Sequence, residues 1–93
     1  MSKTLHWAIL PPVWDDADAA AIRACMVGEA SKEQQARAMK WIIEKACGTY
    51  EWAFDPNSQR NTEVALGRQF VGKQIIALPL KLDVIKTSRR QLK

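Results

Sequence analysis

Residues 61–76, NTEVALGRQFVGKQII, decide the fold of this 93-residue chain. Asn61 or Thr62 is suited to cap the first free N–H groups of a helix, and Glu63 suits the positive end of the helix. The following residues recur at helical spacing along one face. The positions of that face are Val64, Gly67, Val71, Ile75 and Leu78, and Leu66, Phe70 and Ile76 widen it. The stretch predicts a helix that packs against other parts of the protein.

Two glycines, Gly67 and Gly72, lie inside this predicted helix. Each costs about 1 kcal/mol relative to alanine in a helix interior. We therefore expect both positions to allow the close approach of another backbone or side chain, from the same chain or from a second subunit. Together with Phe70, they form a predicted protein-contact site.

Pro79 is expected to end or to kink this helix, because proline lacks an N–H donor and clashes with the preceding turn. Either a last short helix or an extended segment fits residues 80–85. The final residues, TSRRQLK (87–93), are basic and are expected to be loose. We assign residues 83–93 to a basic C-terminal tail.

Two shorter helices are predicted before this stretch. The first begins at the aspartates of residues 15–18, which suit the positive end of a helix, and ends near Gly28. The second begins at Ser31, whose pairing with Gln34 three residues later is typical of a capping box, and ends at Gly48. The sequence thus predicts an all-α fold, a small three- to four-helix domain.

Residues 1–14 are predicted to form an extended arm before the helical domain, which we assign to residues 15–82. Pro11 and Pro12 exclude a helix there. The arm is apolar and is expected to dock, either on the chain's own helices beside Trp41 or in a groove of a neighbouring subunit. Its predicted protein-contact residues are Trp7, Ile9, Leu10 and Trp14.

The loop between the second and third helices is rich in aromatic residues. Tyr50, Trp52 and Phe54 alternate along it, and turn-forming residues follow at positions 55–58. We expect these aromatic side chains to fill a gap between helices. Stacking on bases of single-stranded nucleic acid is the alternative.

The charge of the chain is divided unevenly. Residues 1–55 hold six Lys and Arg against eight Asp and Glu, a net charge of −2, whereas residues 56–93 hold eight against two, a net charge of +6. This division favours contact between the C-terminal part and DNA or an acidic protein surface; a solvated basic tail is the alternative. The predicted residues are Arg68, Lys73, Lys81, Lys86, Arg89, Arg90 and Lys93.

No motif for catalysis or cofactor binding occurs in the sequence. It lacks the patterns GxxxxGKS/T, GxGxxG, HExxH and GxSxG. His6 is the only histidine, and Cys25 and Cys47 are the only cysteines, so one chain cannot supply four Cys and His ligands to zinc. We predict no enzyme, no metal site and no cofactor, and we expect both cysteines to be buried and reduced.

No apolar stretch approaches the about 20 residues that span a membrane. The first residues also lack the pattern of a signal peptide. A soluble, intracellular protein is therefore expected.

Three segments between about Ala17 and Leu82 carry a resemblance to a known family. They read QQARAMKWIIEKACG (34–48), YEWAFDPNS (50–58) and NTEVALGRQFVGKQII (61–76). The chain resembles a family of small helical proteins of tailed, mainly short-tailed, bacteriophages, encoded among the portal and head genes. The family has a Gly-Arg pair, an apolar residue, Val-Gly and an apolar run in the third segment. Gln69 stands where the family commonly has a second basic residue.

The resemblance implies a structural or assembly protein of the virion, associated with the portal or the head. In one version of this hypothesis the protein lies inside the head and leaves with the DNA. The expected partners are phage structural proteins and DNA, and a homo-oligomer or ring-bound component is expected. The protein would lie in the virion, and in the host cytoplasm during assembly. A DNA-binding packaging factor, such as a small terminase-like subunit, and a small inhibitor of a host enzyme are the alternatives.

Overall fold

The structure, a computed structural model, describes the backbone of residues 5–91 and the side chains of residues 5–84. Its helices are α1 (Asp16–Met26), α2 (Lys32–Trp41) and α3 (Gln59–Gln91). A 3-10 turn, η1 (Trp7–Ile9), interrupts the arm, and a π-helical turn, η2 (Ile42–Ala46), continues α2. Because all regular elements of the described residues are helical, the all-α prediction is confirmed.

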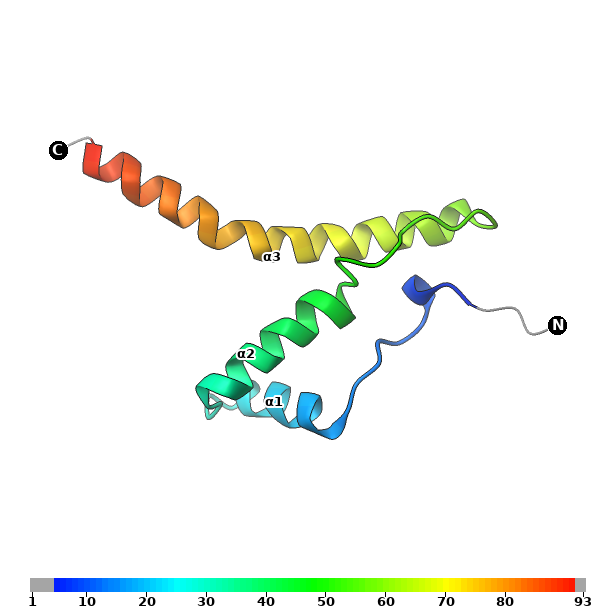
Figure 1. Cartoon of the computed structure of the whole chain (residues 1–93), viewed down its shortest axis with the longest axis horizontal. Coiled ribbons are helices and arrows are strands. Elements are labelled where there is room, and N and C mark those ends of the chain that lie inside the picture. The colour runs from blue at the N-terminus through cyan, green and yellow to red at the C-terminus, as the bar shows by residue number, and fades with distance from the viewer. Residues whose placement is uncertain (1–4, 92–93) are drawn as a thin grey trace.

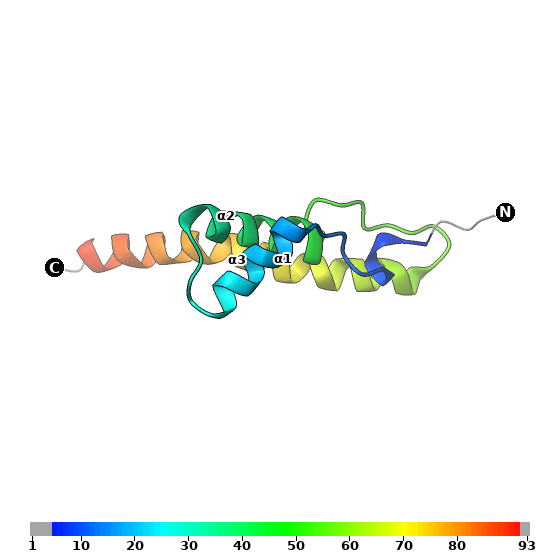
Figure 2. The same ribbon diagram turned by 90° about the horizontal axis from the view of Figure 1, so that it is seen from below.

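The helices form an open arrangement rather than a bundle. α1 and α2 pack together as a helical hairpin, while η1 and η2 pack against the first half of α3 (Figure 1). Seen at right angles, the second half of α3 again extends beyond the hairpin (Figure 2). The molecule measures 65 × 32 × 16 Å, and its radius of gyration of 17.2 Å exceeds the about 12 Å of a compact chain of this length.

The starts of α1 and α2 are fixed by the local chemistry that the sequence predicts. The side chain of Asp15 accepts a hydrogen bond from the N–H of Asp18, and the Asp18 side chain accepts one from the N–H of Asp15. Ser31 and Gln34 make the same reciprocal pair at α2. After α1, Gly28 has a φ of 75°, a conformation that glycine adopts without strain.

The start of α3 differs from the prediction. The helix begins at Gln59, because the Ser58 hydroxyl oxygen accepts the hydrogen bond from the Asn61 N–H at 3.1 Å. Asn61 and Thr62, the predicted caps, instead use their side chains to hold the preceding loop at Asp55. Thr62 accepts from the Asp55 N–H, and the Asn61 amide donates to the Asp55 carboxylate.

Pro79 lies inside α3 and does not end it. The proline removes the hydrogen bond to the carbonyl of Ile75, and the ribbon bends in this part of the helix (Figure 1). The predicted kink is therefore present, while the predicted end is wrong. The helix also crosses the predicted boundary between residues 82 and 83. Of residues 87–93, which are expected to be loose, residues 87–91 are helical, and residues 92 and 93 lie outside the described residues.

Small residues make up the core. The buried apolar side chains are those of Ala8, Ala21, Ala38, Cys47 and Ala65, and no large side chain among the described residues is fully buried. Burial of a large aliphatic or aromatic side chain contributes about 1.5–3 kcal/mol each. The described chain therefore obtains little of the stabilisation that a usual core supplies.

Candidate protein-contact surfaces

Arg68 holds the arm and the end of η2 against α3. Its guanidinium donates hydrogen bonds to the carbonyl oxygens of Lys45 and Ala46 on one side, and of Trp7 and Ala8 on the other. The guanidinium carbon lies 4.9 Å from the centroid of the Trp7 ring, a cation–π distance. Its charge also suits the negative C-terminal end of the helix that η2 completes.

This arrangement corrects the prediction that Arg68 is an exposed charge for a polyanion. All its donor nitrogens are directed at carbonyls of the chain itself. The acceptors lie 22 to 61 residues away in the sequence, so no local pattern indicates them. Lys73 and Lys81 are exposed on α3, as a polyanion contact requires. The side chains of Lys86, Arg89 and Arg90, and all of Lys93, lie outside the described residues, and their contacts stay a prediction.

Gln69 stands beside Arg68 and is 5% exposed. Its side-chain amide donates to the carbonyl oxygens of Gly48 at 3.1 Å and Glu51 at 2.7 Å. Gln69 thus joins α3 to the loop that follows η2. A Lys or Arg side chain would need more space at this buried position.

Gly72 confirms the expected close approach, and the neighbour belongs to the same chain. A Cβ atom at this position would overlap the hydroxyl oxygen of Thr49 and lie 3.0 Å from the Cβ of Cys47. Gly67 is exposed, and a Cβ there would have no neighbour within 4 Å. Its predicted close contact is therefore absent within the described residues.

The arm docks on the chain's own helices, one of the two predicted possibilities. The indole N–H of Trp7 donates to the carbonyl of Trp52 at 2.8 Å, and the Trp41 indole N–H donates to Val13 at 2.9 Å. Gly48, with a φ of 57°, lets the Trp7 ring pack against its backbone. Trp7 is half-buried by these contacts, whereas Ile9, Leu10 and Trp14 remain exposed.

The aromatic loop does not fill a gap between helices, so that expectation is wrong. Tyr50, Trp52 and Phe54 are all exposed, Trp52 to 77%. The carboxylate of Glu51 lies between Tyr50 and Trp52, and that of Asp55 follows Phe54. The negative charge disfavours the alternative of stacking on nucleic-acid bases, because phosphates would be repelled.

A further apolar surface runs along α3. Val71, Leu78 and Leu82 are each at least half exposed, and Val64 is 40% exposed. Their spacing of seven and four residues places them on one side of the helix, with Ile75 between. We call Val64, Val71, Ile75, Leu78 and Leu82 the α3 stripe. Phe70, a predicted contact residue, is also exposed beside it.

The α1–α2 hairpin has an apolar groove of about 460 Å³ between its two helices. We call it the Cys25 groove, and its lining residues are Ile22, Cys25, Met26, Gln35, Ala38, Met39 and Ile42. Cys25 is an exposed free thiol, which corrects the expectation that both cysteines are buried; Cys47 is buried as expected. A second apolar hollow, of about 480 Å³, adjoins Trp14 and Trp41.

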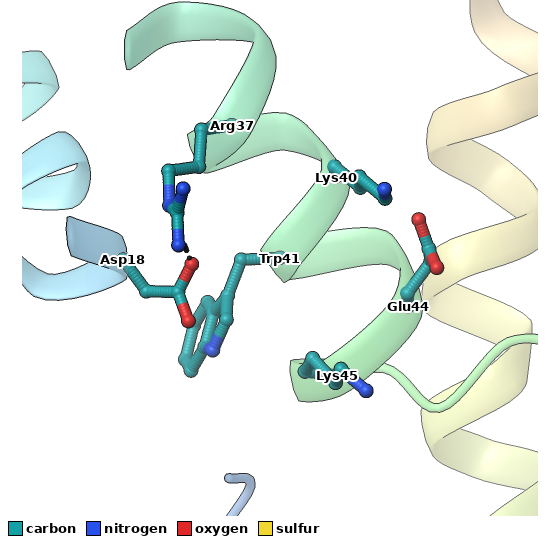
Figure 3. Close-up of a pocket in the computed structure, with 6 residues that line it drawn as sticks. All are labelled: Asp18, Arg37, Lys40, Trp41, Glu44 and Lys45. Atoms are coloured by element: carbon teal, nitrogen blue, oxygen red, sulfur yellow. Dashed lines mark hydrogen bonds and ion pairs between the residues drawn. The ribbon is translucent and has the colours of Figure 1, made fainter. Parts of the chain in front are cut away.

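A polar pocket of about 280 Å³ is lined by Asp18 of α1 and by residues of α2 and η2 (Figure 3). Arg37 makes ion pairs with Asp15 at 3.0 Å and Asp18 at 2.9 Å, and these contacts raise the pKa of Arg37. The Asp18 N–H and the charge of Arg37 lower the pKa of Asp15. Lys40 and Glu44 point to the other side of α2. The two ion pairs of Arg37 therefore join α1 and its N-cap to α2.

The described residues contain no group of three or more His, Cys, Asp or Glu side chains placed to hold a metal ion. Within the same part of the chain, every helix falls short of the length or apolar character that crossing a membrane requires. Comparisons with models of known protein families, with curated proteins and with solved structures found no match to this chain.

Proposed function

We propose that this chain is a structural subunit of a bacteriophage particle, held at the portal or inside the head by contacts with other proteins. The observation that carries the proposal is the contrast between its small core and its large apolar surface. Among the side chains that the structure describes, twenty large apolar ones are exposed, and the buried apolar ones are alanines and one cysteine.

The size of the exposed surface supports an assembly role. The chain exposes 7725 Å², whereas a compact monomer of 10.5 kDa exposes about 5,400 Å². An open shape with many exposed apolar side chains is typical of proteins whose surfaces other proteins cover. Tryptophan side chains such as Trp14 and Trp52 are favoured at the centres of such contacts.

The sequence resemblance is the reason why we propose a bacteriophage particle as the assembly. The Gly67–Ile76 segment and the two segments before it are similar to proteins encoded among phage portal and head genes. Two residues of the Gly67–Ile76 segment, Arg68 and Gly72, make contacts within the chain itself. Gly72 and Arg68 hold the fold together, which leaves the apolar residues of the arm, the loop and α3 for partners.

Mass spectrometry of purified particles tests the proposal directly. We expect the chain in particles of the phage that encodes it, at a fixed number of copies. A protein-held subunit should also stay in heads that contain portal but no DNA, after washing at high salt. Absence from the particles would contradict the proposal, and loss together with the DNA would contradict the protein contacts.

A further inference from the structure

Two apolar surfaces of this chain lie on separate parts of the molecule. One is the α3 stripe, and the other is the Cys25 groove of the α1–α2 hairpin. The second half of α3 extends beyond the hairpin in both views, so this part of the stripe does not lie on the groove of its own chain (Figures 1 and 2).

The stripe has the form of a ligand for such a groove. Val71, Ile75, Leu78 and Leu82 follow one another at intervals of four, three and four residues. A helix that binds in a groove presents its apolar anchors at this spacing. The groove lies between two helices, and its lining side chains, Met26 and Met39 among them, are flexible enough to adapt to an inserted helix.

The two surfaces differ in charge. From residue 73 onward the sequence holds six Lys and Arg and one Asp, a net charge of +5. Between Asp15 and Ile42, the segment that contains both helices of the groove, it holds five acidic and four basic residues, a net charge of −1. The basic ends of two α3 helices therefore repel each other, which disfavours a symmetric contact between them.

The excess surface is enough for two contacts on every copy. Compared with a compact monomer the chain exposes about 2,300 Å² more, and two interface sides of standard size bury about 1,600 Å². A symmetric dimer through α3 alone would leave the hairpin groove uncovered. A head-to-tail contact covers one surface of each kind on every copy.

We propose that a second copy of this chain covers the Cys25 groove, by inserting Leu78 and Leu82 of its α3 between α1 and α2. Since each copy carries both surfaces, the contact repeats from copy to copy and builds a ring or an open chain. This inference rests on the proposed function in one respect: it takes assembly to be the role of the exposed apolar surface.

Disulfide trapping tests the contact in the purified full-length protein. In a Leu82→Cys variant, the new thiol would lie near Cys25 of the next copy. Diamide should then produce a ladder of dimers, trimers and longer products on a non-reducing gel. Cys47 does not compete, because it is buried. A matched control is Leu80→Cys, because the side chains of residues two positions apart in a helix point about 200° away from each other around its axis.

We expect Leu82→Cys to be cross-linked at least about tenfold faster than Leu80→Cys, because docked thiols react at a high effective concentration. Adding Cys25→Ser to Leu82→Cys should abolish the ladder. Equal rates for the two variants, or no ladder, would overturn the inference. Dimers that persist without Cys25 would also overturn it, because they would report a symmetric contact between two α3 helices.

Circular dichroism of each variant should match that of the unmodified chain. The double variant with Cys25→Ser and Leu82→Cys should be folded and should form no cross-links. The outcome of disulfide trapping is independent of the outcome of mass spectrometry on purified particles. A protein found in virions but never cross-linked retains the proposed function and loses this contact.

Discussion

Substituting each of the two glycines of α3 by alanine should change stability in opposite directions. At Gly72 a new Cβ would overlap the Thr49 hydroxyl oxygen, which donates a hydrogen bond to the Ile43 carbonyl at 2.6 Å. Thr49 must move to make room for the new Cβ. Overpacking of this kind costs about 1–3 kcal/mol, and loss of the hydrogen bond costs about 1 kcal/mol more.

The same substitution improves the helix by about 1 kcal/mol, since alanine is the better helix former. The net expectation for Gly72→Ala is therefore a loss of about 1–3 kcal/mol in the free energy of unfolding. At Gly67 no atom lies within 4 Å of the new Cβ, so only the helix gain remains. Gly67→Ala should stabilise the protein by about 1 kcal/mol.

Urea unfolding followed by circular dichroism and tryptophan fluorescence measures both variants. One protein concentration must be used throughout, because association changes the apparent stability. In thermal unfolding, 1 kcal/mol corresponds to about 4–8 °C for a domain of this size. If Gly72→Ala were as stable as the unmodified chain, or if both variants shifted in the same direction, the packing described for Thr49 would be wrong.

Three further predictions concern other contacts. Arg68→Ala should lower the free energy of unfolding by about 2–4 kcal/mol. Arg68→Lys should recover only part of this loss, because lysine lacks the planar set of N–H donors of the guanidinium. Urea unfolding measures both variants, and full recovery by lysine would contradict the role given to those donors. The pKa of Asp15 and the pKa of Asp55 are held below their ordinary value of 3.8, chiefly by the Asp18 N–H and by the Asn61 side chain, respectively, so the unfolded chain binds protons first on acidification. The stability that these carboxylates contribute above about pH 4 should fall as the pH drops through their folded-state pKa values. In a series of unfolding curves at different pH, Asp55→Asn should flatten this dependence. At a protein concentration low enough to separate the copies, a thiol reagent should modify Cys25 at once and Cys47 only on unfolding. Equal rates for the two thiols in the native monomer would contradict the described burial.

The helix starts of the hairpin could be predicted because the chemistry that fixes them is local. A capping box needs only two residues three positions apart, and both Asp15–Asp18 and Ser31–Gln34 form as expected. The cost of a glycine in a helix predicted a close approach at both Gly67 and Gly72. It is found only at Gly72, so this cost alone does not indicate packing.

The role of Arg68 could not be predicted, because its acceptors are main-chain carbonyls that carry no sequence signal. Net charge favoured a polyanion contact, yet tertiary hydrogen bonds use this residue inside the chain. Helical periodicity also fails to tell a core-facing stripe from an exposed one. Leu78 fits the pattern of a buried position and is 65% exposed, because no other described element packs over that part of α3.

The hydrogen bonds of Arg68 have a consequence for the order of events during synthesis. The arm supplies its Trp7 and Ala8 carbonyls to a residue made about 60 positions later. The α1–α2 hairpin depends on contacts close in sequence and so can form while the chain is still growing. The arm therefore leaves the ribosome before both helices but is fixed after them. Proteolysis of stalled chains of increasing length should find the arm open to cleavage until Arg68 has emerged.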